Sequence, residues 1–351
     1  MLHLRYRLTR VGEILQDTAG RIRRKVSSGV LILGYHRVID VDRDPYSLTV
    51  STRNFSEQLE VLRRHCTPVP LSRLVANLRA GKSERREVAI TFDDGYIDNL
   101  RFAKPIMERH SFPGTVFIAS GYLGLEREYW WDELERIFLT PGELPATLEL
   151  SICGQPRQWT LGDACRYGAE EEARERRSNY SCDPRSSARL KFFAELHGVV
   201  RSLPSPDLAA VMTQLAAWAG IDRRPRPNYR PMTSDEVREL ESGGLVRVGA
   251  HTVTHPDMSR LNREQQRAEI HQNKDFLEDL LGRPMENFAY PYGYYSDESP
   301  KILQEAGFAG ACTTHNDLTW PSADPYLLPR YTMFNWNGDE FARRIERWFD
   351  G

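Results

Sequence analysis

Short apolar runs alternate along this chain with segments in which apolar residues recur every three or four positions. The runs at 30–35, 88–92 and 114–119 predict buried strands, because a strand covered on both faces reads as continuous apolar sequence. Helical spacing predicts a helix at 54–64 and another that ends near His110. This order of strand, helix and strand predicts a parallel sheet with crossover helices.

The alternation stops between about residues 122 and 230. This stretch contains a helix-like segment at 130–138, a charge run at 170–177 that suits a solvated helix face, and a proline- and arginine-rich exit at 223–231. We expect a mostly helical insertion here, and not a second catalytic domain.

The alternation of strands and helices resumes after the insertion. A helix is expected at 233–240, where Thr233 and Glu236 have the spacing of a capping box. Further strands are expected at 245–250, 287–290 and 309–313, and further helices at 263–281 and 299–306. One α/β domain over residues 29–351, open or closed into a barrel and interrupted at about 122–230, accounts for these elements.

Composition narrows the functional classes. The chain has 351 residues, 27% of them charged, and a formal net charge of −2, so it lacks the basic excess of a nucleic-acid-binding protein. It contains no apolar run of about 18 residues, so we expect no membrane span. Its five cysteines are scattered and form no CxxC pair, which favours reduced thiols in a cytoplasmic protein.

Residues 1–28 predict a basic N-terminal helix. Arginines interrupt it throughout, so it does not have the apolar core of a signal peptide. Its apolar residues recur at helical spacing, namely Leu4, Leu8, Val11, Ile14 and Leu15. Such a helix either packs on the domain or makes peripheral contact with anionic lipid at the inner face of the membrane.

Three segments that carry candidate functional residues follow expected strands. Asp93 and Asp94 come after 88–92, His251 and His255 after 245–250, and an aromatic turn occupies 288–293. Parallel α/β folds place their active sites at these carboxyl ends of strands. Each segment also has a simpler reading, since Asp-Asp-Gly suits a turn and an aromatic turn suits core packing.

The two histidines are four residues apart, so on a helical turn both imidazoles would share a face and reach one ion. Alone, this spacing also occurs by chance on surfaces. Together with the acidic pair it predicts a metal site, because two neutral imidazoles and one carboxylate leave open positions on a catalytic divalent metal. Two histidines and a carboxylate also bind non-haem iron for oxygen chemistry, but the adjacent Asp93 provides a spare base that hydrolysis needs.

The segments TFDDG (91–95), HTVTH (251–255) and FAYPYG (288–293) resemble successive motifs of the polysaccharide deacetylase family, also called carbohydrate esterase family four. The resemblance covers about residues 30–120 and 230–335. It implies a distorted (β/α) barrel of the polysaccharide deacetylase type, interrupted by the insertion. It also implies an enzyme that removes an N-acetyl group from an aminosugar substrate.

By this resemblance, Asp93 corresponds to the catalytic base, and Asp94, His251 and His255 correspond to the metal ligands. The resemblance implies zinc, with cobalt or manganese as alternatives. The metal would activate a water and polarise the acetyl carbonyl. The backbone N–H of Tyr292 would help to stabilise the oxyanion that forms.

Two departures from the family pattern concern the partner of the catalytic base and the identity of the general acid. Many members carry an arginine in the third motif, where this chain has Ala289 and Tyr290, and a late Leu-x-His that supplies the acid. The late segment here ends in Arg330, which we predict as a substitute partner for Asp93. An ordinary structural ion pair is the alternative for Arg330.

The poly-N-acetylglucosamine deacetylases resemble this chain more closely, because their acid histidine lies in an early strand-end motif. The segment GYHR (34–37) fits that place, so we predict His36 as the general acid. A structural histidine at this position and an acid at His315 are the alternatives.

The sequence does not specify the substrate. A cytoplasmic location favours a lipid-linked or nucleotide-linked sugar or a glycosylated metabolite over a finished extracellular polymer. Hydrolysis of a non-sugar amide, a cyclic ureide or an acetate ester on the same fold, and a carbohydrate-binding pseudoenzyme, are further alternatives. Trp130 and Trp131 are expected either to form a wall of a sugar cleft or to anchor the insertion to the barrel.

Overall fold

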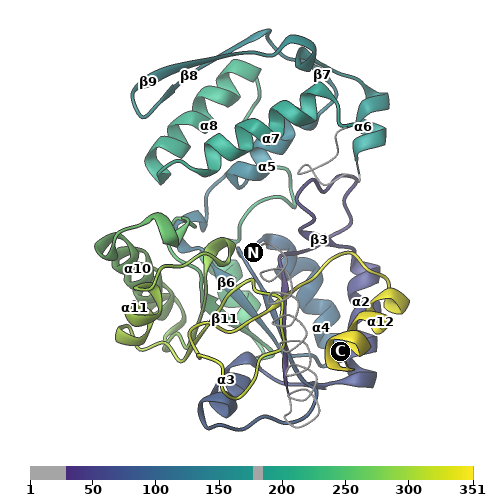
Figure 1. The fold of residues 1–351 in the computed structure, drawn as a ribbon, viewed down its shortest axis with the longest axis vertical. Coiled ribbons are helices and arrows are strands. Elements are labelled where there is room, and N and C mark those ends of the chain that lie inside the picture. The colour runs from purple at the N-terminus through teal and green to yellow at the C-terminus, as the bar shows by residue number, and fades with distance from the viewer. Residues whose placement is uncertain (1–28, 177–184, 351) are drawn as a thin grey trace, which may run out of the picture.

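The computed structural model describes residues 29–176 and 185–350, and its central element is a curled parallel sheet (Figure 1). The basic N-terminal helix expected at 1–28 lies outside the described residues. The sheet follows the order β13-β12-β11-β6-β5-β1-β14, and β4 pairs with β5. It ends at β13 and β14 and is therefore a half-barrel. Every pairing along this path is parallel, as the sequence predicted.

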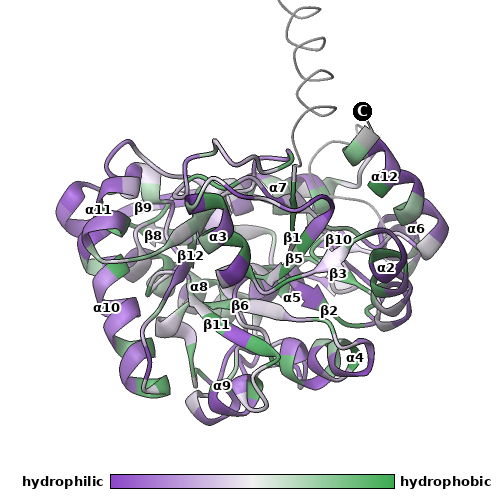
Figure 2. Cartoon of the chain, turned by 90° about the horizontal axis from the view of Figure 1, so that it is seen from below, coloured by the Kyte–Doolittle hydropathy of each residue, from purple (hydrophilic) through white to green (hydrophobic). Residues whose placement is uncertain are grey.

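The strands of this sheet are short and buried. They are β1 (Leu31–Tyr35), β4 (Thr67–Pro68), β5 (Glu87–Phe92), β6 (Gly114–Ile118), β11 (Val246–Ala250), β12 (Asn287–Ala289), β13 (Gly310–Cys312) and β14 (Tyr331–Thr332). A separate small pairing joins β2 (Arg37–Val38) to β3 (Thr49–Val50). Figure 2 shows β1 and β5 as hydrophobic strands inside a shell of largely hydrophilic helices such as α10 and α11.

Helices of the barrel cover the outside of this sheet. They are α2 (Thr52–His65), α3 (Leu71–Arg79), α4 (Lys104–His110), α9 (Ser234–Glu241), α10 (Arg263–Leu281), α11 (Ser299–Glu305) and α12 (Gly338–Asp350). A π-helical turn at Asn99–Ala103 precedes α4, and 3-10 turns lie at Ser120–Tyr122, Gly162–Cys165, Met258–Arg260 and Pro291–Gly293. The capping box predicted for Thr233 and Glu236 is present at the start of α9. No described helix combines the length and apolar composition needed to cross a membrane.

The insertion forms a separate layer next to the barrel (Figure 1). Its helices are α5 (Trp130–Leu139), α6 (Ala169–Glu175), α7 (Ala188–Arg201) and α8 (Ser205–Ala219). It also contains two antiparallel pairings that the sequence analysis missed: β7 (Gly142–Glu143) with β10 (Arg166–Tyr167), and the hairpin of β8 (Thr147–Ile152) and β9 (Gln155–Thr160). The insertion packs around its own hydrophobic core, which includes Phe138 and Phe193.

Candidate metal and catalytic site

The two acidic residues of the first motif lie in a tight turn at the carboxyl end of β5. Asp94 has a φ of 74° and Gly95 a φ of 81°, so the chain reverses direction within two residues. A Cβ atom on Gly95 would lie 2.6 Å from the Cδ1 of Ile118, and a positive φ also disfavours side chains. Glycine is therefore required here. The turn leaves the buried carboxylates of Asp93 and Asp94 adjacent at the same end of the sheet.

The histidines follow β11 in an irregular loop, and our expectation of a helical turn at this motif was wrong. Thr252 and His255 both have positive φ values, 66° and 56°. The carboxylate of Glu269 explains this conformation, because it accepts hydrogen bonds from the backbone N–H groups of Val253 (2.8 Å) and Thr254 (2.9 Å). A side chain from α10 thus replaces the hydrogen bonds that a helix would have provided.

Asp94, His251 and His255 place three ligand atoms within 4.8 Å of one another. Oδ1 of Asp94 lies 3.2 Å from Nε2 of His255 and 3.6 Å from Nε2 of His251. Ligands on one tetrahedral zinc ion lie about 3.4 Å apart, given bond lengths of about 2.1 Å. Oδ1 is also fully buried and has no well-aligned hydrogen-bond donor, which would be costly for a carboxylate without a cation. These three residues therefore fit a divalent metal.

The protonation of the two imidazoles suits ligation. Nδ1 of His251 lies 2.7 Å from the carbonyl oxygen of Ala289, so that carbonyl can hold the proton on Nδ1 and leave Nε2 as a ligand. Burial lowers the pKa of His255 and outweighs the opposing effect of Asp94, so this imidazole is neutral near pH 7. Burial alone would raise the pKa of Asp94, but the two histidines outweigh it, and the pKa is lowered.

Asp93 is paired with Arg330. The guanidinium donates from Nη1 to Oδ1 and from Nη2 to Oδ2, both at 2.7 Å, and both side chains are buried. Burial would raise the pKa of Asp93, but the charge and hydrogen bonds of Arg330 outweigh it, so the pKa is lowered. We predicted this partner for Asp93 from the sequence. The structure shows the contact, while the catalytic role of either residue stays a prediction.

His36 follows β1 at the same end of the sheet. Its charge helps to lower the pKa values of both Asp93 and Asp94, which places it within electrostatic reach of the two carboxylates. Its imidazole is half-buried and makes no hydrogen bond or ion pair to another residue in the described part of the chain. His315, the alternative acid, is exposed after β13. The role of His36 as the general acid, and the alternative of His315, both stay predictions.

The third motif forms a 3-10 turn in which Tyr292 has a φ of 58°. Gly293 has a φ of 75°, and a Cβ atom there would lie 2.0 Å from Oγ1 of Thr314. The ring of Tyr292 packs edge-on against His255, with ring centroids 4.6 Å apart. The guanidinium of Arg201, at the end of α7, lies 4.3 Å from the centroid of the Tyr292 ring. The role of the Tyr292 N–H in binding an oxyanion stays a prediction.

Trp130 and Trp131 are both buried, at 4% exposure each, which leaves neither ring open for a sugar. Trp131 stacks on Tyr129, with centroids 4.6 Å apart, and donates from Nε1 to the hydroxyl of Tyr96 at 2.6 Å. Its ring lies 5.2 Å from that of His255. The anchoring alternative therefore fits these two residues, and the expectation of a sugar-stacking wall does not.

Several supporting residues escaped the sequence analysis. Asn273 accepts a hydrogen bond from the N–H of His251 at 3.1 Å and donates to the carbonyl of Ile118 at 3.0 Å. Tyr129 donates to the carbonyl of Asp94 at 2.5 Å. A detectable signal existed for Glu269 and Asn273, which are polar residues four positions apart on one face of the helix predicted at 263–281.

Comparison with known proteins identifies the family. The family described as polysaccharide deacetylase matches residues 80–144 and 206–311. The first matched stretch contains the Asp93–Asp94 turn, and the second contains both histidines and the third motif. The chain belongs to the polysaccharide deacetylase family. This confirms the resemblance to the family that the three motifs indicated.

The individual curated relatives of this chain are distant from it in sequence. The poly-β-1,6-N-acetyl-D-glucosamine N-deacetylase of Staphylococcus aureus (strain MRSA252) is 21% identical over 129 residues, which cover 34% of this chain and 43% of that protein. The matches span less than half the length of the first curated relatives.

Two solved structures have the same fold. Streptococcus pyogenes deacetylase PplD, in complex with acetate, aligns over 93% of this chain and all of its own, with a TM-score of 0.56 and 15% identity. IcaB from Ammonifex degensii aligns over 92% of this chain and 98% of its own, with a TM-score of 0.56 and 17% identity. These likenesses confirm the deacetylase-type half-barrel.

Proposed function

We propose that this protein is a metal-dependent N-deacetylase that acts on an N-acetylated aminosugar within a glycan, a lipid-linked sugar or a glycosylated metabolite. The observation that carries the proposal is the buried Asp93–Arg330 pair beside the cluster of Asp94, His251 and His255. The three residues of the cluster can bind a metal, and the neighbouring carboxylate of Asp93 remains available to accept a proton. The named activity of the Staphylococcus aureus relative supports the sugar class.

The metal would be held by Asp94, His251 and His255, and when bound it lowers the pKa of a coordinated water and polarises a carbonyl. Zinc suits one carboxylate and two imidazoles, and cobalt or manganese are alternatives. Asp93 accepts the proton of the attacking water. Arg330 keeps Asp93 ionised and fixes the plane of its carboxylate, so the acceptor oxygen is positioned before the reaction begins.

His36 and Tyr292 complete the proposed chemistry. The amine that leaves an amide is a poor leaving group until it is protonated, and the imidazole of His36 is the nearby donor without another assigned partner. The N–H of Tyr292 is proposed to donate to the oxygen that gains negative charge. Water then supplies its oxygen to acetate, and the sugar departs as the amine.

Acetate release tests the proposal directly. The protein, treated with chelator and then reloaded with Zn²⁺, Co²⁺ or Mn²⁺, is incubated with N-acetylglucosamine and its oligomers. Acetate and new amines should appear in equal amounts in the reloaded protein, and neither should appear in the metal-free protein. Undiminished acetate release by protein shown to be metal-free would overturn the metal-dependent mechanism.

The cellular location of the chain and its contact with a membrane are proposed separately from the reaction. The cytoplasmic location and the peripheral membrane contact through residues 1–28 stay predictions from the sequence. Fractionation of cells that express the full chain and a variant lacking residues 1–28 tests both predictions.

A further inference from the structure

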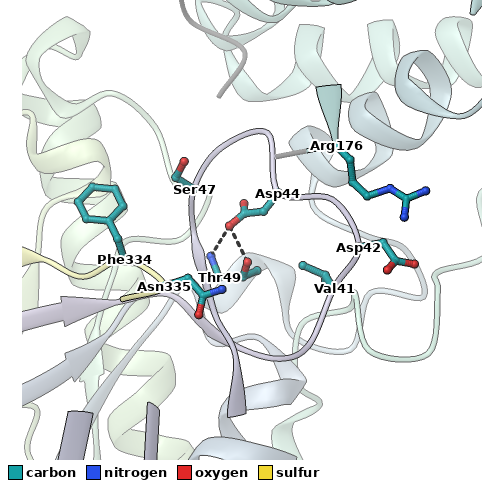
Figure 3. A pocket seen from close by; sticks show the side chains of 8 residues that line it. All are labelled: Val41, Asp42, Asp44, Ser47, Thr49, Arg176, Phe334 and Asn335. Carbon is teal, nitrogen blue, oxygen red and sulfur yellow. Dashed lines mark hydrogen bonds between the residues drawn. The ribbon is translucent and has the colours of Figure 1, made fainter. Parts of the chain in front are cut away.

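The insertion is fixed to the barrel by the loop between β2 and β3 (Figure 3). Asp44 braces this loop, since its carboxylate accepts a hydrogen bond from the N–H of Thr49 at 2.8 Å. Arg43 of the same loop pairs with Glu135 of α5 at 3.2 Å and with Glu172 of α6 at 2.6 Å. These side chains are largely shielded from water, so the insertion is held in a defined position next to the strand ends.

The insertion also contacts the loop that carries the two histidines. The ring of Trp131, on α5, lies 5.2 Å from the ring of His255, measured between centroids. Ser205, the first residue of α8, donates from its hydroxyl to the hydroxyl of Thr254 at 2.8 Å. Two helices of the insertion thus contact neighbouring residues of this loop.

Helix α7 of the insertion contacts the third motif. Arg201 is the last residue of this helix, and its guanidinium carbon lies 4.3 Å from the ring centroid of Tyr292 and 5.3 Å from that of Tyr294. Arg201 is half-buried and forms no ion pair with another residue in the part of the chain that the structure describes. Its cation therefore interacts with the faces of the two aromatic rings, which attract positive charge.

The backbone of Tyr292 has a conformation that requires support. Its φ of 58° and ψ of 1° lie in the left-handed region, which disfavours a bulky side chain. Its carbonyl accepts a hydrogen bond from Oγ1 of Thr314 at 3.2 Å, and its ring packs against His255 and Arg201. Because φ relates the side chain to the N–H of the same residue, contacts that fix the ring also fix the direction of the N–H.

We propose that Arg201 is a positioning residue, which stacks its guanidinium on the ring of Tyr292 and so holds the Tyr292 N–H in place to bind the oxyanion. The inference rests on the proposed deacetylase function and deepens it by giving the insertion a task in the reaction. The oxyanion forms only on the way to the tetrahedral intermediate, so Arg201 should affect kcat and not KM.

The test uses Arg201→Met and Arg201→Gln, which remove the cation but keep a long side chain. Zinc-loaded protein is assayed on the trisaccharide of N-acetylglucosamine and on an aryl acetate, since both substrates form a tetrahedral oxyanion. We expect kcat to fall about tenfold on each substrate, with KM, zinc content and the thermal unfolding temperature unchanged. Lys191→Met is the matched control, because it removes an exposed cation from the same helix, and it should keep the wild-type kcat.

Substitutions of Tyr292 show whether Arg201 acts through the ring. Tyr292→Ala removes the ring and should itself lower kcat, and Arg201→Met should cause no further loss in this background. Tyr292→Phe keeps the ring, so Arg201→Met should still lower kcat about tenfold in that background.

The outcomes separate this inference from the proposed function. A wild-type kcat in both Arg201 variants would overturn the positioning role and leave the deacetylase function standing. An undiminished effect of Arg201→Met in the Tyr292→Ala background would also overturn it, because Arg201 would then not act through the ring. Loss of zinc or of thermal stability in parallel with kcat would show a purely structural role. Zinc-loaded wild type that hydrolysed the aryl acetate but no N-acetylated sugar would contradict the deacetylase function alone, and the ester would still test Arg201.

Discussion

Arg330 holds Asp93 from the opposite part of the chain: 237 residues separate them, yet their side chains make two parallel hydrogen bonds of 2.7 Å. The same guanidinium donates from Nε to the carbonyl of Thr313 (2.9 Å) and from Nη1 to the hydroxyl of Thr91 (3.0 Å). These contacts attach Arg330 to β5 and to the residue that follows β13. The carboxylate of Asp93 is therefore fixed in its plane as well as kept ionised.

Substitution of Arg330 tests this positioning. Arg330→Lys keeps the charge but lacks the planar fork, so we expect kcat to fall about 10²-fold through misplacement of Asp93, with metal content unchanged. Arg330→Met leaves a buried carboxylate unpaired and should cost about 3–5 kcal/mol of unfolding free energy. Acetate release, metal analysis and urea unfolding measure these three quantities.

The exposed pair of Arg166 and Glu143, at 3.1 Å, supplies the matched control. Arg166→Lys should change neither turnover nor stability appreciably, because exposed ion pairs contribute about 0–1 kcal/mol. If Arg330→Lys turned over substrate at the wild-type rate, the pair would be structural only.

The two carboxylates of the first motif should respond differently to substitution. His255→Ala removes a ligand, so the purified protein should retain little zinc and lose activity. Asp93→Asn should retain zinc close to the wild-type amount and still lose turnover, because the role that we propose for Asp93 is proton transfer and not metal binding. Atomic absorption gives the zinc content per chain, and acetate release gives the turnover.

His65→Ala, at the far end of α2, controls for a general effect of losing a histidine and should keep both zinc and activity. Equal zinc loss in Asp93→Asn and His255→Ala would mean that the roles of Asp93 and Asp94 are exchanged.

Much of the barrel could be predicted from sequence because periodicity and capping are local. The helix expected at 263–281 has those bounds, and Thr233 caps the preceding helix, α9, as its spacing indicated. Continuous apolar runs likewise identified β1, β5, β6 and β11, since buried parallel strands have this signature.

Features that depend on distant contacts were not predictable in this way. The loop of His251 and His255 is irregular because Glu269 binds its backbone, and no local pattern reveals that partner. The hairpin of β8 and β9 also escaped, because β9 is almost entirely exposed and lacks apolar alternation. Short strands such as β14 are defined by pairing with β1, and two residues carry no periodicity.

Stability should depend on pH through Asp132 on α5. This carboxyl is buried, accepts a hydrogen bond from Tyr96 at 2.6 Å and lies 3.7 Å from Arg37. Burial raises its pKa to about 7, and the charge of Arg37 only partly offsets this effect. The folded state therefore retains a proton between about pH 4 and pH 7 that the unfolded state has lost, and stability falls as pH rises through this window.

Asp132→Asn removes this titration. Between pH 5 and pH 8, wild type should lose about 2–3 kcal/mol more of its unfolding free energy than the variant does. This amount corresponds to the roughly two pH units between pH 5 and the pKa of Asp132 in the folded state. Asp235→Asn, on the exposed face of α9, should show no such increase. Parallel pH profiles of wild type and Asp132→Asn would show that Asp132 is ionised throughout the range. Urea unfolding at each pH provides the measurement.

We expect His36 to act as the general acid. It follows β1 at the strand ends that carry Asp93 and His251, and it influences the charge of both carboxylates. Since the family's usual late histidine is replaced by Arg330, another group must protonate the departing amine. General acid catalysis contributes about 10²–10⁴-fold, so kcat of His36→Ala should fall by that order while zinc content is unchanged.

An activated ester separates proton donation from every other role of this histidine. The leaving group of an aryl acetate departs as a stable anion, so its hydrolysis needs no acid, and His36→Ala should retain most of its activity on this substrate. His315→Ala should retain activity on both substrates, since His315 is exposed after β13. A proportional loss on amide and ester would indicate that His36 positions the substrate and is not the acid. Loss of zinc in His36→Ala would indicate that His36 supports the metal site. Loss of amide hydrolysis in His315→Ala alone would assign the general acid to His315. Either result would contradict the placement of the proton donor at the end of β1.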